Sequence, residues 1–173
     1  MALTEKERRT ECSASKSVPC RFAVDGMLGT LAKWLRILGY DTLFNPAWTD
    51  HQLARLARSE GRVLLTRDRE LSRRRGFGSL LITSESLDEQ IRQVLETVPG
   101  TGEAGIDACG LASRCPVCND VLQVIDRETA CALVPPYVAQ TQKSFSQCPG
   151  CRRVYWRGTH WQHMLEYLER IRQ

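Results

Sequence analysis

Two kinds of hydrophobic pattern alternate along residues 20–98. Short apolar runs are typical of strands that are buried on both faces of a sheet, whereas apolar residues spaced every three or four positions are typical of helices packed on one side. The pattern predicts strands at 20–25, 41–45, 62–66 and 77–83, and helices at 27–39, 49–61, 68–76 and 86–98. Because strands that alternate with helices usually pair in parallel, the sequence predicts an α/β fold, a small three-layer α/β/α sandwich with a parallel sheet.

The remaining segments lack this alternation and divide the chain. Residues 1–19 are polar and without periodicity, which predicts a flexible tail. The glycine-rich segment 99–112 is typical of a linker, and the part from 113 to 173 ends in a predicted helix at 159–173. We therefore expect two folded parts, one at 20–98 and one at 113–173.

Composition narrows the class of protein. Hydrophobic residues make up 42% of the chain, which is enough for a folded core, and the net charge of +4 permits a polyanionic partner without requiring one. No apolar run approaches the roughly 20 residues of a membrane helix. The N-terminal residues also lack the apolar stretch of a secretory signal, so we expect no membrane association and a cytoplasmic location.

Four of the eight cysteines form two C-x-x-C pairs, Cys115 with Cys118 and Cys148 with Cys151. Each pair can offer two thiolates from one tight turn, and two such turns complete a tetrahedral site of four sulfurs. In a chain expected in the cytoplasm, this spacing favours a metal site over disulfides. Zinc is the expected structural ion, although an iron centre would have the same ligands. A redox dithiol would explain one pair but not both.

Acidic residues recur where predicted strands end. Asp25, Asp68 and Glu85 each end or follow a predicted strand, and Asp50 begins a predicted helix. Since the carboxyl ends of parallel strands meet at one edge of a sheet, we expect these carboxylates to lie close together. Converging carboxylates repel one another, and a bound Mg²⁺ or Mn²⁺ would offset that repulsion. Such an ion could activate water for attack on a phosphate.

Each of these acids also has a structural explanation. Asp50 could cap its helix, although Thr49 competes for that position. Asp68 would be favoured in a first helical turn by the helix dipole, and Asp25 could form a turn. Glu85 could simply be solvated. The hypothesis of a metal site therefore depends on the position that the acids share and not on any one of them.

Two groups of arginines could bind RNA phosphates. One group surrounds Asp68, and the other follows the second cysteine pair beside Tyr155 and Trp156, where bases could stack on aromatic rings. The alternative is that the arginines form a solvated face and the aromatic rings pack a small core. The candidates for RNA binding are Arg67, Arg69, Arg73, Arg152 and Arg153.

Three segments carry a resemblance to a known family: "FAVDGMLGTLAKWLRILGYDT", "GRVLLTRDREL" and "CPVC…CPGCRRVYWRGTHW". Together they closely resemble the Mut-seven C-terminal ribonuclease family over about residues 20–170. The resemblance implies a PIN-like nuclease domain at 20–98, followed by a zinc ribbon at 113–173. It also implies that Asp25 and Asp68 are metal-binding catalytic acids, with Asp50 as the middle acid. The last acid of the family pattern has only Glu85 as a nearby candidate, and this is a departure from the pattern.

The sequence and the resemblance together predict a metal-dependent ribonuclease. Asp25, Asp50 and Asp68 would be catalytic with Mg²⁺ or Mn²⁺, structural zinc would occupy the cysteine site, and the ribbon would assist RNA binding. The alternative is a non-catalytic RNA- or ribosome-binding module that keeps the fold without the chemistry. A third possibility, an iron-containing redox protein, predicts a coloured sample.

Overall fold

The computed structural model describes residues 20–101 and 110–172, so the predicted tail at 1–19 lies outside the described residues. Within the first part, strands and helices alternate as the sequence predicts. The elements are β1 (Arg21–Val24), the 3₁₀ turn η1 (Gly26–Leu28), α1 (Gly29–Ile37), β2 (Asp41–Phe44), α2 (Asp50–Glu60), β3 (Val63–Thr66), α3 (Arg69–Ser72), β4 (Ser79–Leu81) and α4 (Leu87–Thr97). All strand pairs are parallel, in the order β2-β1-β3-β4, which confirms the predicted α/β fold.

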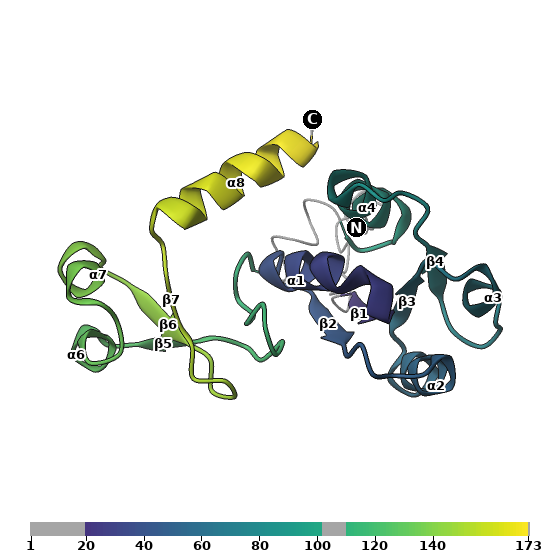
Figure 1. Ribbon diagram of the computed structural model, residues 1–173, viewed down its shortest axis with the longest axis horizontal. Coiled ribbons are helices and arrows are strands. Elements are labelled where there is room, and N and C mark those ends of the chain that lie inside the picture. Colours follow the sequence, from purple (N-terminus) through teal and green to yellow (C-terminus); the bar gives the residue numbers. More distant parts are fainter. Residues whose placement is uncertain (1–19, 102–109, 173) are drawn as a thin grey trace, which may run out of the picture.

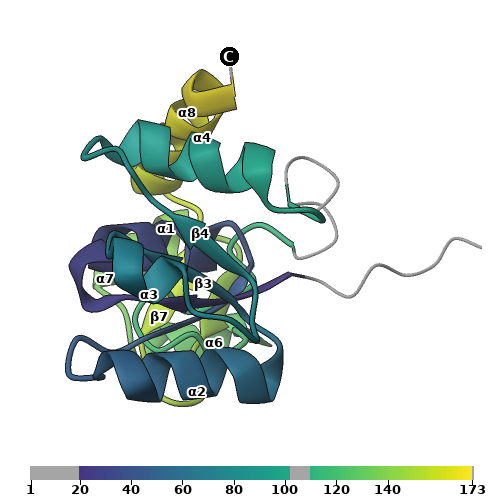
Figure 2. The same ribbon diagram turned by 90° about the vertical axis from the view of Figure 1, so that its right-hand side faces the viewer.

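Side chains that alternate along the strands produce three layers. Phe22 and Val24 belong to a core cluster with residues of α1 and α4, whereas Ala23, between them, belongs to a second cluster with Leu53 of α2 and Leu71 of α3. Figure 2 shows α2 on one side of the sheet and α1 and α4 on the other. The short apolar strands are therefore buried on both faces, as the hydrophobic pattern predicts.

The second part is a small antiparallel sheet with a helical insertion. Its elements are β5 (Gln123–Ile125), α6 (Arg127–Cys131), α7 (Pro136–Thr141), β6 (Phe145–Gln147), β7 (Val154–Trp156) and α8 (Thr159–Arg172), with strand order β5-β6-β7. The sequence predicts short strand-like pieces between the cysteine pairs, but two helices also lie there. Asp126 caps the first through a hydrogen bond from the Thr129 N–H, and Pro136 begins the second.

The C-terminal helix α8 returns to the first part of the chain. Leu168 and Ile171 are 5% and 3% exposed and belong to the same core cluster as residues of α1 and α4. Figure 1 shows α8 running back from the small sheet toward α4. In the described part of the chain, no helix is long and apolar enough to cross a membrane.

A polar network attaches the small sheet to the edge strand β2. Asn119 is 7% exposed, its side-chain oxygen accepts the Thr42 N–H at 2.9 Å, and its amide nitrogen donates to Asp41 at 2.7 Å. Arg62 also contacts Asp41, at 2.8 Å. Buried polar groups are tolerated when they are paired, so this network fixes the contact between the two parts through hydrogen bonds.

Arg36 provides the second half of this attachment. Helical spacing places it away from the apolar face of α1, yet it is 5% exposed. Its guanidinium donates to the carbonyls of Thr42 at 2.8 Å, Val117 at 2.8 Å and Pro116 at 3.2 Å. The turn that carries the first cysteine pair is therefore held directly on α1 and β2.

The Asp41 carboxylate gives this attachment a pH dependence. Burial opposes its ionisation, but hydrogen bonds from Arg62 and Asn119 outweigh burial and hold its pKa below the ordinary value of 3.8. A depressed pKa stabilises the fold above the unfolded-state pKa and ceases to do so as the pH falls through the folded-state value. We expect Asp41→Asn to lower the free energy of unfolding by about 2 kcal/mol at pH 7.

The free-energy difference between Asp41→Asn and the unsubstituted protein should shrink as the pH falls below 3.8, because the carboxylate is then protonated in the unfolded state before it is protonated in the native state. Urea unfolding of both proteins between pH 7 and pH 3 measures this difference, with Glu96→Gln as a control for removal of an exposed carboxylate. A difference in the free energy of unfolding that stayed constant with pH would contradict the stabilising role given to the charge of Asp41.

Candidate active site and metal centre

Asp25 and Asp68 are brought to the same edge of the sheet and are linked through Thr66. Strands β1 and β3 are neighbours, and the Asp25 N–H donates to the Leu65 carbonyl at 3.0 Å. The hydroxyl of Thr66, which is fully buried, donates to Asp25 Oδ2 at 2.7 Å and accepts the Asp68 N–H at 3.0 Å. One hydroxyl thus orients the first acid and the backbone of the second.

Asp68 is also the N-cap of the short helix α3. Its Oδ1 accepts the N–H groups of Glu70 at 2.6 Å and Leu71 at 2.9 Å, so Asp68 caps the helix from the position just before the first turn, the turn in which the sequence predicted it. Both capping bonds go to Oδ1, and Asp68 is an exposed residue. Its Oδ2 remains a possible ligand atom.

Asp50 lies in the first turn of α2, but Thr49 holds the cap. The Thr49 side chain accepts the Gln52 N–H, and the Gln52 side chain accepts the Thr49 N–H, which forms a capping box. The structural explanation that Asp50 caps its helix is therefore wrong. Asp50 instead lies 3.6 Å from Arg74, which follows α3, and its side chain is 50% exposed.

Glu85 is 87% exposed and pairs with Arg67 at 3.1 Å. One of the arginines predicted to bind RNA therefore has an acidic partner in the free protein. An exposed ion pair contributes little to stability, about 0 to 1 kcal/mol, so a phosphate could replace the carboxylate. Solvation, the structural explanation for Glu85, agrees with its exposure.

The four cysteines of the C-x-x-C pairs form a compact cluster. Their sulfurs all lie within 4.8 Å of one another, and Sγ–Sγ distances are 3.6 Å for Cys115 and Cys151 and 3.2 Å for Cys118 and Cys148. In a tetrahedral zinc site with Zn–S bonds near 2.3 Å, sulfurs are about 3.8 Å apart. The cluster could therefore hold a metal ion such as zinc. Among the described residues, no other group of three or more potential ligands is as compact, so the three aspartates do not form such a group.

The two cysteine turns have the same backbone geometry. The Asn119 N–H donates to the Cys115 carbonyl, and the Arg152 N–H donates to the Cys148 carbonyl, both at 3.0 Å. Asn119 and Arg152 have left-handed φ angles of 75° and 63°, which reverse the chain and direct both cysteines of each pair to one point. Arg152 therefore has a structural task in addition to its predicted contact with RNA.

Tyr155 supports one of the cysteines from the neighbouring strand β7. Its hydroxyl lies 3.1 Å from Cys115 Sγ. Burial raises the pKa of the Cys115 thiol, but hydrogen bonds from Tyr155 and from backbone N–H groups outweigh burial and lower this pKa to about 6. Because a metal binds the thiolate, this environment favours the coordinating form of Cys115, whereas burial raises the pKa of the Cys118 and Cys148 thiols. Trp156, in contrast, is 37% exposed, so packing in a small core does not account for the whole side chain.

The sequence did not identify Thr66, Asn119 or Arg36 as parts of these sites, and it indicated Tyr155 as a ring for base stacking and not as a partner of Cys115. Thr66 stands two positions before Asp68, and this T-x-D spacing was the one available signal. Asn119 follows the first cysteine pair directly, where a left-handed residue often closes a turn. Nothing in the sequence indicates that Arg36 contacts a turn some 80 positions later, since that contact exists only in the folded chain.

Comparison with known proteins gives one finding. A sequence model of the family described as Mut7-C RNAse domain matches residues 20–168. No curated protein and no solved structure matches the chain. The family match covers both the parallel sheet and the cysteine cluster, and it agrees with the resemblance carried by the three sequence segments.

The cysteine cluster predicts a specific effect of substitution. We expect Cys148→Ser to remove one bound metal ion per chain and to lower the melting temperature, because the turn that it anchors contacts the rest of the cluster. Elemental analysis of the purified protein measures the loss. Cys131→Ser is the matched control, since Cys131 is exposed and lies outside the cluster. Equal metal loss in both variants would argue against the cluster as the binding site.

Proposed function

Because the chain belongs to the Mut7-C RNAse domain family, we propose that it is a metal-dependent ribonuclease that hydrolyses phosphodiester bonds of RNA. The family implies an RNA substrate and a nuclease-like function. The observation that supports hydrolysis most directly is the link from the Asp25 carboxylate through the Thr66 hydroxyl to Asp68. This link joins residues at the ends of neighbouring parallel strands, at the edge where α/β proteins bind ligands, and it supports the proposal that the two acids act together.

In this proposal Asp25 and Asp68 hold Mg²⁺ or Mn²⁺ through carboxylate oxygens, the ligands that these hard ions prefer. When bound, the ion would supply activation of water and neutralisation of charge at the scissile phosphate. Thr66 keeps Asp25 in one orientation, and the α3 cap keeps Asp68 in one rotamer. Asp50 completes the acidic set, and its exposed ion pair with Arg74 is weak enough to be exchanged for another partner.

The arginines would bind the phosphate backbone on either side of the acids. Arg69 is the first residue of α3 and Arg73 follows the helix, and both are exposed, while Arg67 precedes them with its exchangeable partner Glu85. Such contacts fix the position of a strand without reading its sequence. Arg152 and Arg153 are exposed on the second cysteine turn, so zinc in the cysteine cluster would place them rigidly for RNA binding.

A non-catalytic RNA-binding module is the second candidate. Two observations favour it: Asp68 already caps a helix, and the three aspartates do not gather into one compact group among the described residues. Both candidates involve RNA, and they differ in whether the acids hold an ion. We further propose that the protein is located in a reducing compartment such as the cytoplasm, because the thiols of a cysteine cluster stay reduced there and can bind a metal ion.

Substitution of Asp25 separates the two candidates. We expect Asp25→Asn to reduce cleavage of labelled single-stranded RNA in Mn²⁺ on the order of 100-fold or more, because one ligand of the ion is lost. Glu85→Gln is the matched control, an acid at the same edge that is expected to retain activity. Products formed equally fast by Asp25→Asn would refute the assignment, and a gel shift without products in the unsubstituted chain would favour the binding module.

A further inference from the structure

A cavity of about 210 Å³ lies between α1 and α8, away from the acidic edge. Lys33 and Trp34 line it from α1, and His160, His163 and Tyr167 line it from α8. Figures 1 and 2 both show α8 above α1, at about the level of α4. At roughly 30 Å³ for each water molecule, this volume is that of about seven waters, which is space for a planar ring.

Two aromatic rings form one wall of the cavity. The ring centroids of Trp34 and Tyr167 are 4.5 Å apart with an interplanar angle of 40°, and both side chains are partly exposed. The Tyr167 hydroxyl donates to Asp88 of α4, and this bond fixes the ring from the far side. The Arg170 guanidinium lies over the Tyr167 ring, 5.2 Å from its centroid, so Trp34 is the ring better suited to stacking against a nucleobase.

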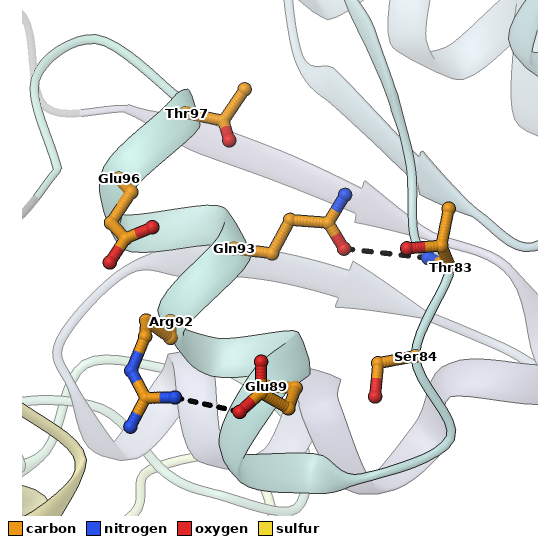
Figure 3. A pocket seen from close by; sticks show the side chains of 7 residues that line it. All are labelled: Thr83, Ser84, Glu89, Arg92, Gln93, Glu96 and Thr97. Carbon is orange, nitrogen blue, oxygen red and sulfur yellow. Dashed lines mark hydrogen bonds and ion pairs between the residues drawn. The ribbon is translucent and has the colours of Figure 1, made fainter.

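The charge at the rim complements a phosphate. Lys33, His160 and His163 are exposed, and the cavity lining contains no carboxylate. Figure 3 shows the contrasting cavity beside α4, where Glu89 and Glu96 are part of the lining and Arg92 is paired with Glu89 at 2.7 Å. That second cavity presents acids to a polyanion, whereas the cavity between α1 and α8 presents a lysine and two histidines.

We propose that the cavity between α1 and α8 binds one nucleobase of a single-stranded RNA. The base stacks on Trp34 beside Tyr167, and Lys33 with the two histidines contacts the flanking phosphate. This proposal rests on the proposed function and adds to it a second contact with the substrate. Lys33 lies about 6 Å along α1 from the helix start at Gly29, shortly after Asp25, at 1.5 Å per residue. One strand could therefore reach both the acidic edge and the cavity.

The test uses the full chain carrying Asp25→Asn, without divalent ions, so that binding is measured in the absence of cleavage. A short single-stranded RNA is compared with versions in which one nucleotide at a time lacks its base, and dissociation constants are measured by fluorescence anisotropy. We expect one position at which removal of the base weakens binding about tenfold, as loss of a stacked base would. Equal binding at every position would overturn the proposal.

Lysine substitutions test the phosphate contact independently. We expect Lys33→Gln to reduce the slope of log affinity against log salt concentration by about 0.7, the value for one phosphate contact on a single strand. Lys143→Gln, an exposed lysine outside the cavity, is the matched control and should leave the slope unchanged. The same change in both variants would overturn the assignment.

The stacking itself has a separate readout. Quenching of tryptophan fluorescence by the RNA should decrease when Trp34→Phe removes the reporter and keeps an aromatic ring, and quenching that did not change would overturn the contact. Cleavage of RNA by the unsubstituted chain in Mn²⁺ is scored in parallel. Failure of the proposed function would then appear as absent cleavage products. Failure of the cavity proposal would appear as equal dissociation constants for all RNAs that lack one base.

Discussion

Parallel pairing of β1 with β3 is the constraint on which the acidic edge depends. Val24 pairs with Leu65, so Asp25 and Thr66, the next residues along the chain, lie at the same edge of the sheet. From there the Thr66 hydroxyl contacts both Asp25 and the backbone of Asp68. A shift of register by one residue would turn the Thr66 side chain to the other face and break both bonds. Since the register is held by side chains buried on both faces of the sheet, apolar packing determines where these polar groups lie.

The same dependence of polar chemistry on packing is found at the cysteine cluster. Arg36 is buried between α1, β2 and the first cysteine turn, and burial lowers its pKa while the nearby Cys115 and Cys118 oppose that effect. A site of four thiolates carries excess negative charge even with a divalent ion, so an adjacent guanidinium offsets part of it. Arg36 therefore stabilises the cluster by its charge and attaches it to β2 by hydrogen bonds to backbone carbonyls.

The sequence was sufficient wherever a single local pattern determines the structure. Apolar runs located the four parallel strands, and the spacing of the cysteines located the cysteine cluster. The helices α6 and α7 were missed because five and six residues are too few to show helical periodicity, although Asp126 and Pro136 were signals of helix starts. Arg36 was assigned to an outer helix face for a different reason: helical spacing describes one helix and contains no information about the turn that covers it.

Helix α1 connects all of these features and sets their separations. It begins just after Asp25, packs its apolar face on the core, contacts the first cysteine turn through Arg36, and lines the cavity through Lys33 and Trp34. A nine-residue helix is a stiff element, with an axial length of about 14 Å. The distance from the acidic edge to the cysteine turn therefore follows from helix geometry and not from the length of the predicted linker at 99–112. In the proposed function, a metal ion at the cysteines would consequently affect RNA binding without direct contact with the acids, because both sites depend on the placement of one helix.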